Sequence, residues 1–454
     1  MVSILVRNGI VVTLDSNDRI IEDGAVAVEK DKIVDIGLSK ELEKKYSADH
    51  VIDAKGKVVL PGLVCSHNHV YNAITHAMPF KHFPTTFIGF LEDLWWPYIE
   101  DQLTKDEIYA AAQMASVVMI KSGVTCFADV LEAPNAIPGA LEMEAKALRN
   151  VGIRGVLSFE ASERISEENA ELSTKENLNF VKKWNRKDDL IRGKFCTHTT
   201  ISCSEKLLKR VRGLADKYGG GIHIHLEEGP DESMFSHVKY RKTPVEFYED
   251  IGFLGPDVLA SQCVYTTDRE IEILKRHNVK ISHQPMSNSE IGSIVAPVVK
   301  CLKNGLIVGL GTDGFTYDMF EVMRFSSLIH KAHLQNMSVM SSEEVLRMAT
   351  RNGGEAIGLG EMVGSLQPNK KADLLIVDLK PLTPLTPENV VTQLVLLGSG
   401  CQVETVIVNG KIVMQNKKLL TVNEEDARRL ALEAAETLWE VLKKNRRDLP
   451  KYRC

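Results

Sequence analysis

Two short segments carry histidines whose spacing could do chemistry. Apolar runs lead into His67 and His69 in one segment, and contain His223 and His225 in the other. Side chains two residues apart on a β-strand point to the same face, so each segment directs two imidazoles toward one place. Neutral imidazole is a ligand for zinc, iron and similar ions. The two pairs therefore indicate a metal site, provided that their strands lie in one sheet.

Further polar side chains follow apolar runs elsewhere in the chain. His198, His283 and Asp313 stand at the ends of such runs, and glycines near Asp313 leave room for its carboxylate to approach a shared centre. Each group alone is more often structural than functional. Together they favour one metal held by three histidines and one aspartate, with water in the open position. The residues alone leave open which histidine of the second pair takes part.

Alternating strand-like and amphipathic segments would bring these groups together. Parallel βα units show this alternation, and eight of them predict a (β/α)8 barrel that binds ligands at the carboxyl ends of its strands. Between the first two strands, the aromatic-rich span 70–104 is expected as a lid over the barrel mouth or as an extra packed helix. The candidate strands are 58–67, 123–130, 152–160, 193–199, 221–227, 258–264, 279–284 and 306–312.

The two ends of the chain predict a second, smaller unit. Short strand-like segments fill residues 1–58 and return in 362–420, where Asn409-Gly410 is a strong hairpin turn. We expect these two stretches to form one small β-sandwich domain beside an α/β barrel over 59–361. Residues 421–454 are expected to form a C-terminal helix and tail.

Composition limits the class of protein. The 454 residues carry a net charge of −6 without a basic patch, so nucleic-acid binding is not expected. A membrane location is not expected either, because no uncharged apolar stretch approaches the ~20 residues that span a bilayer. The first residues lack the pattern of a signal peptide. Eight cysteines are scattered without a Cys-x-x-Cys motif, which favours reduced thiols and a cytoplasmic location.

The order of these motifs resembles the amidohydrolase superfamily. The resemblance runs essentially from end to end, and it is closest to the branch of cytosine, guanine and S-adenosylhomocysteine deaminases and s-triazine hydrolases. Within that branch, Leu94-Trp95-Trp96 and Thr312-Asp313-Gly314-Phe315 are most similar to aminohydrolases found near selenium- and purine-metabolism genes. The other matching segments are Pro61-Gly62, His67-Asn68-His69, His225-Leu226-Glu227-Glu228, His283, Gly364-Ser365-Leu366, Lys371-Ala372-Asp373-Leu374 and Val408-Asn409-Gly410-Lys411.

The resemblance implies a role for each candidate residue. Glu228 would move the proton, and Asp313 would be both catalytic and a metal ligand. One divalent ion is implied, with zinc first and iron, manganese or nickel as alternatives. The implied metal ligands are His67, His69, His225 and Asp313, and the implied substrate contacts are His198, His283, Trp95 and Trp96.

The implied activity is that of an aminohydrolase. Metal-activated water would attack a ring carbon of a nitrogen heterocycle and release ammonia or another leaving group. The expected partner is therefore a small heterocyclic substrate, and we also expect a homodimer or a higher homo-oligomer.

One position departs from the family pattern. Relatives usually carry a histidine at the end of the sixth strand that orients the attacking hydroxide, and Gln262 stands there in this chain. A glutamine amide can donate or accept a hydrogen bond but does not change charge near neutral pH. Gln262 would therefore position water or substrate, or mark a catalytically altered chain.

Two alternatives to a deaminase follow from these residues. The first is a metal-binding homologue that has lost turnover, with Gln262 as its mark. The second is a cyclic amide hydrolase. It is disfavoured because such relatives bridge two metals through a lysine at the end of the fourth strand, and the segment Phe195–Thr200 contains none.

Overall fold

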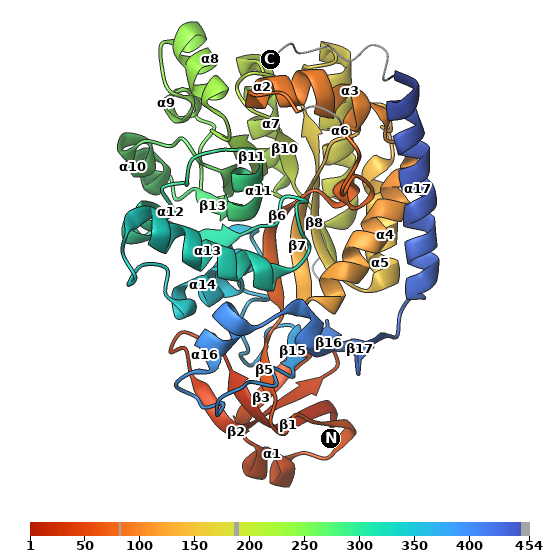
Figure 1. Ribbon diagram of the computed structural model, residues 1–454, viewed down its shortest axis with the longest axis vertical. Helices are drawn as coiled ribbons and strands as arrows, with labels where there is room; N and C mark the ends of the chain where they lie inside the picture. Colours follow the sequence, from red (N-terminus) through yellow and green to blue (C-terminus); the bar gives the residue numbers. More distant parts are fainter. Residues whose placement is uncertain (81–82, 186–189, 446–454) are drawn as a thin grey trace.

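The computed structural model describes residues 1–80, 83–185 and 190–445. Figure 1 shows a barrel surrounded by helices above a smaller unit that contains strands from both ends of the chain. Residues 446–454 of the expected tail lie outside the described residues. Within those ranges, no helix is both long and apolar enough to cross a membrane.

The barrel strands are parallel and follow one another in chain order. Hydrogen-bonded neighbours run from β6 through to β14, with the short β9 beside β8, which confirms the predicted α/β barrel. These strands are almost entirely buried, as expected where helices cover the outside and side chains fill the inside. They are β6 (Leu63–Asn68), β7 (Val124–Leu131), β8 (Arg154–Ala161), β9 (Ile191–Gly193), β10 (Phe195–Thr197), β11 (Ile222–Leu226), β12 (Val258–Gln262), β13 (Lys280–His283) and β14 (Val308–Leu310).

The first and last barrel strands are joined at their carboxyl ends. The His67 carbonyl accepts backbone hydrogen bonds from Thr312 (3.0 Å) and Asp313 (3.2 Å). Gly311 permits this approach, because a Cβ atom there would lie 2.7 Å from the His67 carbonyl oxygen. The segment that carries the first histidine pair is therefore fixed against the segment that carries the aspartate.

Helices follow most barrel strands and cover the outside of the barrel. The first long one, α4, begins at a capping box in which Thr104 and Glu107 each accept the other's backbone N–H. The barrel helices are α4 (Lys105–Lys121), α5 (Ala140–Val151), α6 (Glu167–Trp184), α7 (Glu205–Tyr218), α8 (Pro230–Tyr240), α9 (Pro244–Asp250), α10 (Asp268–Arg276), α11 (Pro285–Glu290), α12 (Val298–Lys303), α13 (Met319–Leu334), α14 (Ser342–Met348) and α15 (Arg351–Ala356).

The smaller sheet combines both ends of the chain, as predicted. Its order is β18-β17-β16-β15-β5-β1-β2-β3, with β4 beside β1, so that β5 joins the N-terminal to the C-terminal strands. Its elements are β1 (Val2–Val12), β2 (Ile20–Glu29), β3 (Lys32–Leu38), α1 (Ser39–Lys45), β4 (Ala48–Asp53), β5 (Val58–Pro61), β15 (Leu374–Val377), α16 (Val390–Thr392), η4 (Gln393–Leu397), η5 (Gly400–Gln402), β16 (Val403–Val408), β17 (Lys411–Gln415) and β18 (Lys418–Leu419).

The run 58–67, predicted as one barrel strand, is two strands in different sheets. The chain passes from β5 in the small sheet to β6 in the barrel at Gly62. A Cβ atom at Gly62 would lie 1.9 Å from Thr125 Oγ1 on β7, so only glycine fits where the chain passes from one sheet to the other. Apolar character continues across the break because both strands are buried, and hydrophobicity alone therefore hides the change of sheet.

Buried contacts hold the small sheet and the C-terminal helix to the barrel. At the start of β8, Arg154 forms a bidentate ion pair with Asp373, which precedes β15 (3.0 and 3.1 Å). The helix α17 (Glu424–Asn445) runs along α4 at the edge of the barrel (Figure 1). Its Trp439 Nε1 donates to the Ile74 carbonyl (3.0 Å), which ties the helix to the loop that follows β6.

Candidate metal and catalytic site

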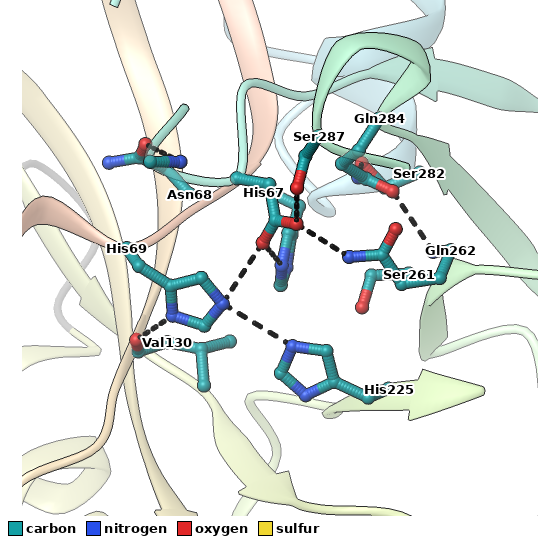
Figure 2. A network of polar contacts seen from close by, with 12 residues as sticks. His67, Asn68, His69, Val130, His225, Ser261, Gln262, Ser282, Gln284 and Ser287 are labelled. Carbon is teal, nitrogen blue, oxygen red and sulfur yellow. Dashed lines mark hydrogen bonds and ion pairs between the residues drawn. The ribbon is translucent and has the colours of Figure 1, made fainter. Parts of the chain in front are cut away.

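Four of the predicted site residues meet at the carboxyl ends of β6, β11 and β14. Asp313 Oδ1 lies 2.9 Å from His67 Nε2 and 3.1 Å from His69 Nε2. His225 Nε2 lies 3.4 Å from His69 Nε2. One ligand atom from each of the four residues lies within 4.8 Å of all the others. Figure 2 shows the three histidines of this group. Three imidazoles and one carboxylate at this spacing fit the donor set of a divalent ion such as zinc.

The second ring nitrogens of His67 and His69 are held from outside by hydrogen bonds, whereas Nδ1 of His225 lies near Glu160 without a hydrogen bond. Such contacts fix the orientation of a ring and leave its Nε2 available to a metal ion. His223, the other histidine of the second pair, therefore supports the donor set from behind. The three contacts are His69 Nδ1 to the Val130 carbonyl (2.8 Å), His67 Nδ1 to His223 Nε2 (3.0 Å) and His225 Nδ1 to Glu160 Oε2 (3.3 Å).

Burial and neighbouring charges set the protonation of the donor set. Burial lowers the pKa of His67 and of His225 to about 3, so both rings are neutral, the form that binds metals. Burial also opposes protonation of His69, but its hydrogen bond with Asp313 and the charge of Glu132 raise its pKa well above the usual value. The buried Asp313 carboxylate thus needs one positive charge beside it, from a proton on His69 or from a metal ion.

Gln262 contacts the ligand carboxylate. Its Nε2 donates to Asp313 Oδ2 (3.0 Å), and Ser287 Oγ donates to the same oxygen (2.6 Å) (Figure 2). The backbone N–H of Gln262 donates to Gln284 Oε1 (3.0 Å), which holds the residue in its left-handed conformation (φ +78°). Gln262 Oε1 is buried and has no hydrogen-bond partner within the described residues. The amide nitrogen is therefore placed to orient Asp313, while the amide oxygen can still accept a hydrogen bond.

A cavity of about 590 Å³ opens above the donor set. Its floor includes His69, His225, Glu228 and Asp313. The aromatic-rich segment that follows β6 forms its outer wall, and α2 and α3 of this segment lie at the end of the barrel away from the small sheet (Figure 1). The segment contains η1 (Val70–Ile74), α2 (Phe87–Phe90), η2 (Leu91–Trp95), α3 (Trp96–Tyr98) and η3 (Glu100–Gln102). Its aromatic side chains that line the cavity are Tyr71, Phe80, Phe83, Phe87, Phe90 and Trp95.

Glu228 and His198 also face the cavity. Burial raises the pKa of Glu228 well above its usual value, and the charge of Asp313 adds to this shift. His198 Nδ1 lies 2.6 Å from Ser202 Oγ, so its other ring nitrogen is left for a ligand. Both residues stand where a substrate above the donor set would meet them.

The remaining predicted substrate contacts divide between the cavity wall and the space behind it. Trp95 lines the cavity, whereas Trp96 is not part of the described lining. Trp96 packs edge-on against His198, with ring centroids 5.9 Å apart. His283 is absent from the described lining as well, and its Nε2 lies 3.0 Å from His330 Nε2 on α13.

Sequence reasoning missed a group of carboxyls beside the donor set. Glu132 follows β7 directly and Glu160 lies near the end of β8, so each carried the same signal as Asp313: an acidic residue at the end of an apolar strand. Burial raises the pKa of each to about 8. Glu100, from the segment over the cavity, stands beside Glu132 and accepts hydrogen bonds from Tyr71 (3.2 Å) and Arg164 (2.9 Å).

The fold and the donor set define the class of protein. A barrel with three histidines and an aspartate converging at the carboxyl ends of its strands is a metal-dependent hydrolase barrel. Residues 58–413 match the amidohydrolase family, and the chain belongs to that family.

Named relatives are similar over nearly the whole chain. The 5'-deoxyadenosine deaminase of Methanosarcina acetivorans is 38% identical, over 96% of this chain and 99% of that protein. The 5-methylthioadenosine/S-adenosylhomocysteine deaminase of Thermococcus sibiricus is 38% identical, over 91% of this chain and 94% of its own length. A zinc-bound adenosine deaminase from Xanthomonas campestris shares the fold, with a TM-score of 0.88 at 23% identity over 96% of this chain and 98% of that one. All three of these proteins are named as deaminases of adenosine or an adenosine derivative.

Proposed function

We propose that this amidohydrolase deaminates an adenosine-type nucleoside, with one zinc ion held by His67, His69, His225 and Asp313. The observation that carries the proposal is that these four residues cluster within 4.8 Å of one another, and that three of them, with Glu228, line one cavity of about 590 Å³. The names of the full-length relatives support the choice of an amino-substituted purine nucleoside. A divalent ion in such a donor set lowers the pKa of a bound water toward ~7 and so supplies a nucleophile at neutral pH.

The residues of the chain carry the proton and hold the reacting groups. Glu228 is buried and its pKa is raised well above its usual value, so this carboxyl holds a proton more readily than a free glutamate; it would take the proton from the attacking water and return it to the substrate. The proton passes to the ring nitrogen and then to the amino group. The new carbon–oxygen bond replaces the carbon–nitrogen bond, and ammonia leaves. Trp95 and His198 bound the space above the floor and would hold the ring against Glu228.

Asp313 stays anionic while this happens. Burial opposes its ionisation, but without an ion the hydrogen bonds from His67 and His69 hold the pKa of Asp313 well below its usual range, and a divalent ion bound in their place would favour the same anionic form. Gln262 and Ser287 fix its other oxygen, so Oδ1 keeps its direction toward the histidines. The glutamine thus takes a positioning role that needs no change of charge.

Ammonia release tests the proposed activity. Chain stripped with a chelator and reloaded with zinc is expected to release one ammonia per adenosine-type nucleoside consumed, with the absorbance shift from an amino- to an oxo-purine. Stripped chain is the matched control and should be inactive. If the zinc-loaded chain released no ammonia from any amino-substituted purine or pyrimidine, the proposal would fail.

A second experiment tests the positioning role of Gln262. Gln262→Ala removes a hydrogen bond to a charged group, an interaction worth about 1.5–3 kcal/mol, so we expect kcat to fall by roughly 10- to 100-fold. Gln262→His should cost less, because an imidazole can also donate, and it should add a titrating limb to the pH profile that the parent lacks.

Ser287→Ala provides the matched comparison, because Ser287 donates to the same oxygen of Asp313. If both residues orient this carboxylate, the double variant should lose less than the two single losses combined. Equal kinetics for the parent, Gln262→Ala and Gln262→His would show that the residue only lines the site.

A further inference from the structure

A largely buried guanidinium stands behind the cavity wall. It belongs to Arg164, in the segment between β8 and α6, and its side chain is 8% exposed and does not line the described cavity. Its Nη2 donates to Glu100 Oε2 (2.9 Å) and its Nη1 donates to Asp101 Oδ1 (2.8 Å). The guanidinium also lies over the Trp96 ring, 5.0 Å from the ring centroid. A planar, forked guanidinium can hold two carboxyls and an aromatic ring together, whereas a lysine ammonium cannot.

One branch of contacts leads from Arg164 to Trp95. Glu100 accepts from Arg164 with Oε2 and from the Tyr71 hydroxyl with Oε1 (3.2 Å). The Tyr71 hydroxyl oxygen in turn accepts from Trp95 Nε1 (3.4 Å). Tyr71, Trp95 and Glu100 all line the cavity. The orientation of the Trp95 ring is therefore linked to a guanidinium that lies outside the described lining.

This branch does not depend on the charge of Glu100. Burial and the nearby Glu132 carboxyl raise the pKa of Glu100 well above its usual value, and the charge of Arg164 opposes that shift. A carboxyl group keeps acceptor capacity for N–H and O–H donors whether or not it holds a proton. The branch therefore rests on the hydrogen-bond geometry and not on a titration.

A second branch leads from Arg164 to His198. Trp96 contacts the guanidinium and packs edge-on against the His198 ring, with ring centroids 5.9 Å apart. Its Nε1 is buried and has no hydrogen-bond partner within the described residues, so packing orients this indole. His198 itself lines the cavity. Loss of the guanidinium would free the ring that supports His198 from behind.

We propose that Arg164 is a positioning residue that orients both side chains expected to hold the substrate ring, Trp95 and His198. The inference rests on the proposed function and adds to it, because these two side chains would hold the ring against Glu228. Arg164 acts without touching the substrate. A displaced wall weakens the hold on the ring in the ground state and in the transition state alike, so the loss should fall mainly on KM.

Arg164→Lys tests this role, because lysine keeps the charge but cannot hold both carboxyls and the indole. With zinc-loaded chain and 5'-deoxyadenosine, we expect KM to rise by about tenfold or more, the scale of one hydrogen bond to a charged group. The kcat should stay within about threefold of the parent value, since the groups that move the proton are untouched. The zinc content should not change.

Arg212→Lys is the matched control. Arg212 forms a forked ion pair of the same kind with Asp257 (3.0 and 2.7 Å), and it does not line the described cavity. Its replacement should leave KM unchanged. A KM for Arg164→Lys within about twofold of the parent value, or an equal rise in both variants, would overturn the inference.

Two further variants test the branches one at a time. Tyr71→Phe removes only the hydroxyl between Glu100 and Trp95, and Trp96→Leu removes the ring behind His198. Each should raise KM, and each should add less than its single effect when combined with Arg164→Lys, because residues along one chain of contacts are not independent. Full additivity in both double variants would contradict action through Arg164. If Arg164→Lys fails to fold, an unchanged KM in both single variants overturns the inference.

Binding separates this inference from the proposed function. Calorimetric titration with 5'-deoxyadenosine compares Glu228→Gln chain with the Glu228→Gln, Arg164→Lys double variant and reports affinity without turnover. A Kd about tenfold higher for the double variant supports the positioning role, even if the wild-type chain releases no ammonia. Equal Kd values overturn this inference alone. No binding by the Glu228→Gln chain overturns both.

Discussion

Replacing Glu228 with glutamine is expected to lower kcat by about 10²-fold or more, the usual contribution of a positioned acid–base group. Glutamine keeps the shape of the side chain but cannot take a proton from water or deliver it to a ring nitrogen. Zinc content and thermal unfolding should match the parent, because Glu228 makes none of the contacts among the donor set. The measurement is steady-state ammonia release at saturating nucleoside, with the zinc content of each preparation determined.

The neighbouring residue gives the matched control. Glu227 is also buried, but it accepts a hydrogen bond from Ser233 (2.9 Å) and does not line the described cavity. The kcat of Glu227→Gln should therefore be close to that of the parent. Near-normal turnover by Glu228→Gln would show that the proton moves by another route, and an equal loss in both variants would point to a disturbed loop.

Much of the fold could be predicted because its strands are buried on both faces. Apolar runs separated by amphipathic segments gave the barrel, and the return of short strands near Asn409 gave the shared small sheet. The change of sheet at Gly62 could not be predicted in the same way. Both strands that meet there are apolar, and only the three-dimensional structure shows that Thr125 leaves no room for a side chain at Gly62.

The donor set was predictable only in part from local rules. Alternation along a strand places His67 with His69, and His223 with His225, on one face, but it does not say which ring of the second pair reaches the centre. In the structure His223 lies two residues before His225 on β11, and its Nε2 contacts Nδ1 of His67. The tertiary arrangement therefore distinguishes His225 from His223, which the two-residue alternation of a strand cannot do.

At the end of a strand, alternation no longer gives the direction of a side chain. Gln262, the last residue of β12, and Asp313, in the loop after β14, have φ values of +78° and +57°, so their side chains leave the strand pattern. His283 carried the same strand-end signal as Asp313, yet it turns toward His330. The residue type at a strand end thus predicts a candidate for the functional site, and the backbone conformation there decides which residue its side chain contacts.

Removing a metal ligand is expected to have the largest effect of all. His67→Ala takes away one of four donors and leaves the Asp313 carboxylate without one of its two ring contacts. Loss of the ion would remove several kcal/mol of stabilisation, so activity should fall by about 10³-fold or more. Elemental analysis of chelator-stripped and reloaded chain should give one zinc per parent chain and much less for the variant.

Comparison with a residue behind the donor set makes this test specific. His223→Leu keeps all four ligands but removes the ring that holds His67 Nδ1, and contacts of this kind are worth about 10- to 100-fold in metal affinity. His237→Ala, on α8 outside the described cavity lining, should change neither zinc content nor turnover. The expected order of zinc affinity is therefore the parent and His237→Ala, then His223→Leu, then His67→Ala. Two tightly held metals per chain, or full activity in His67→Ala, would contradict a single site, because a ligand that can be deleted without loss is not part of the centre that activates water.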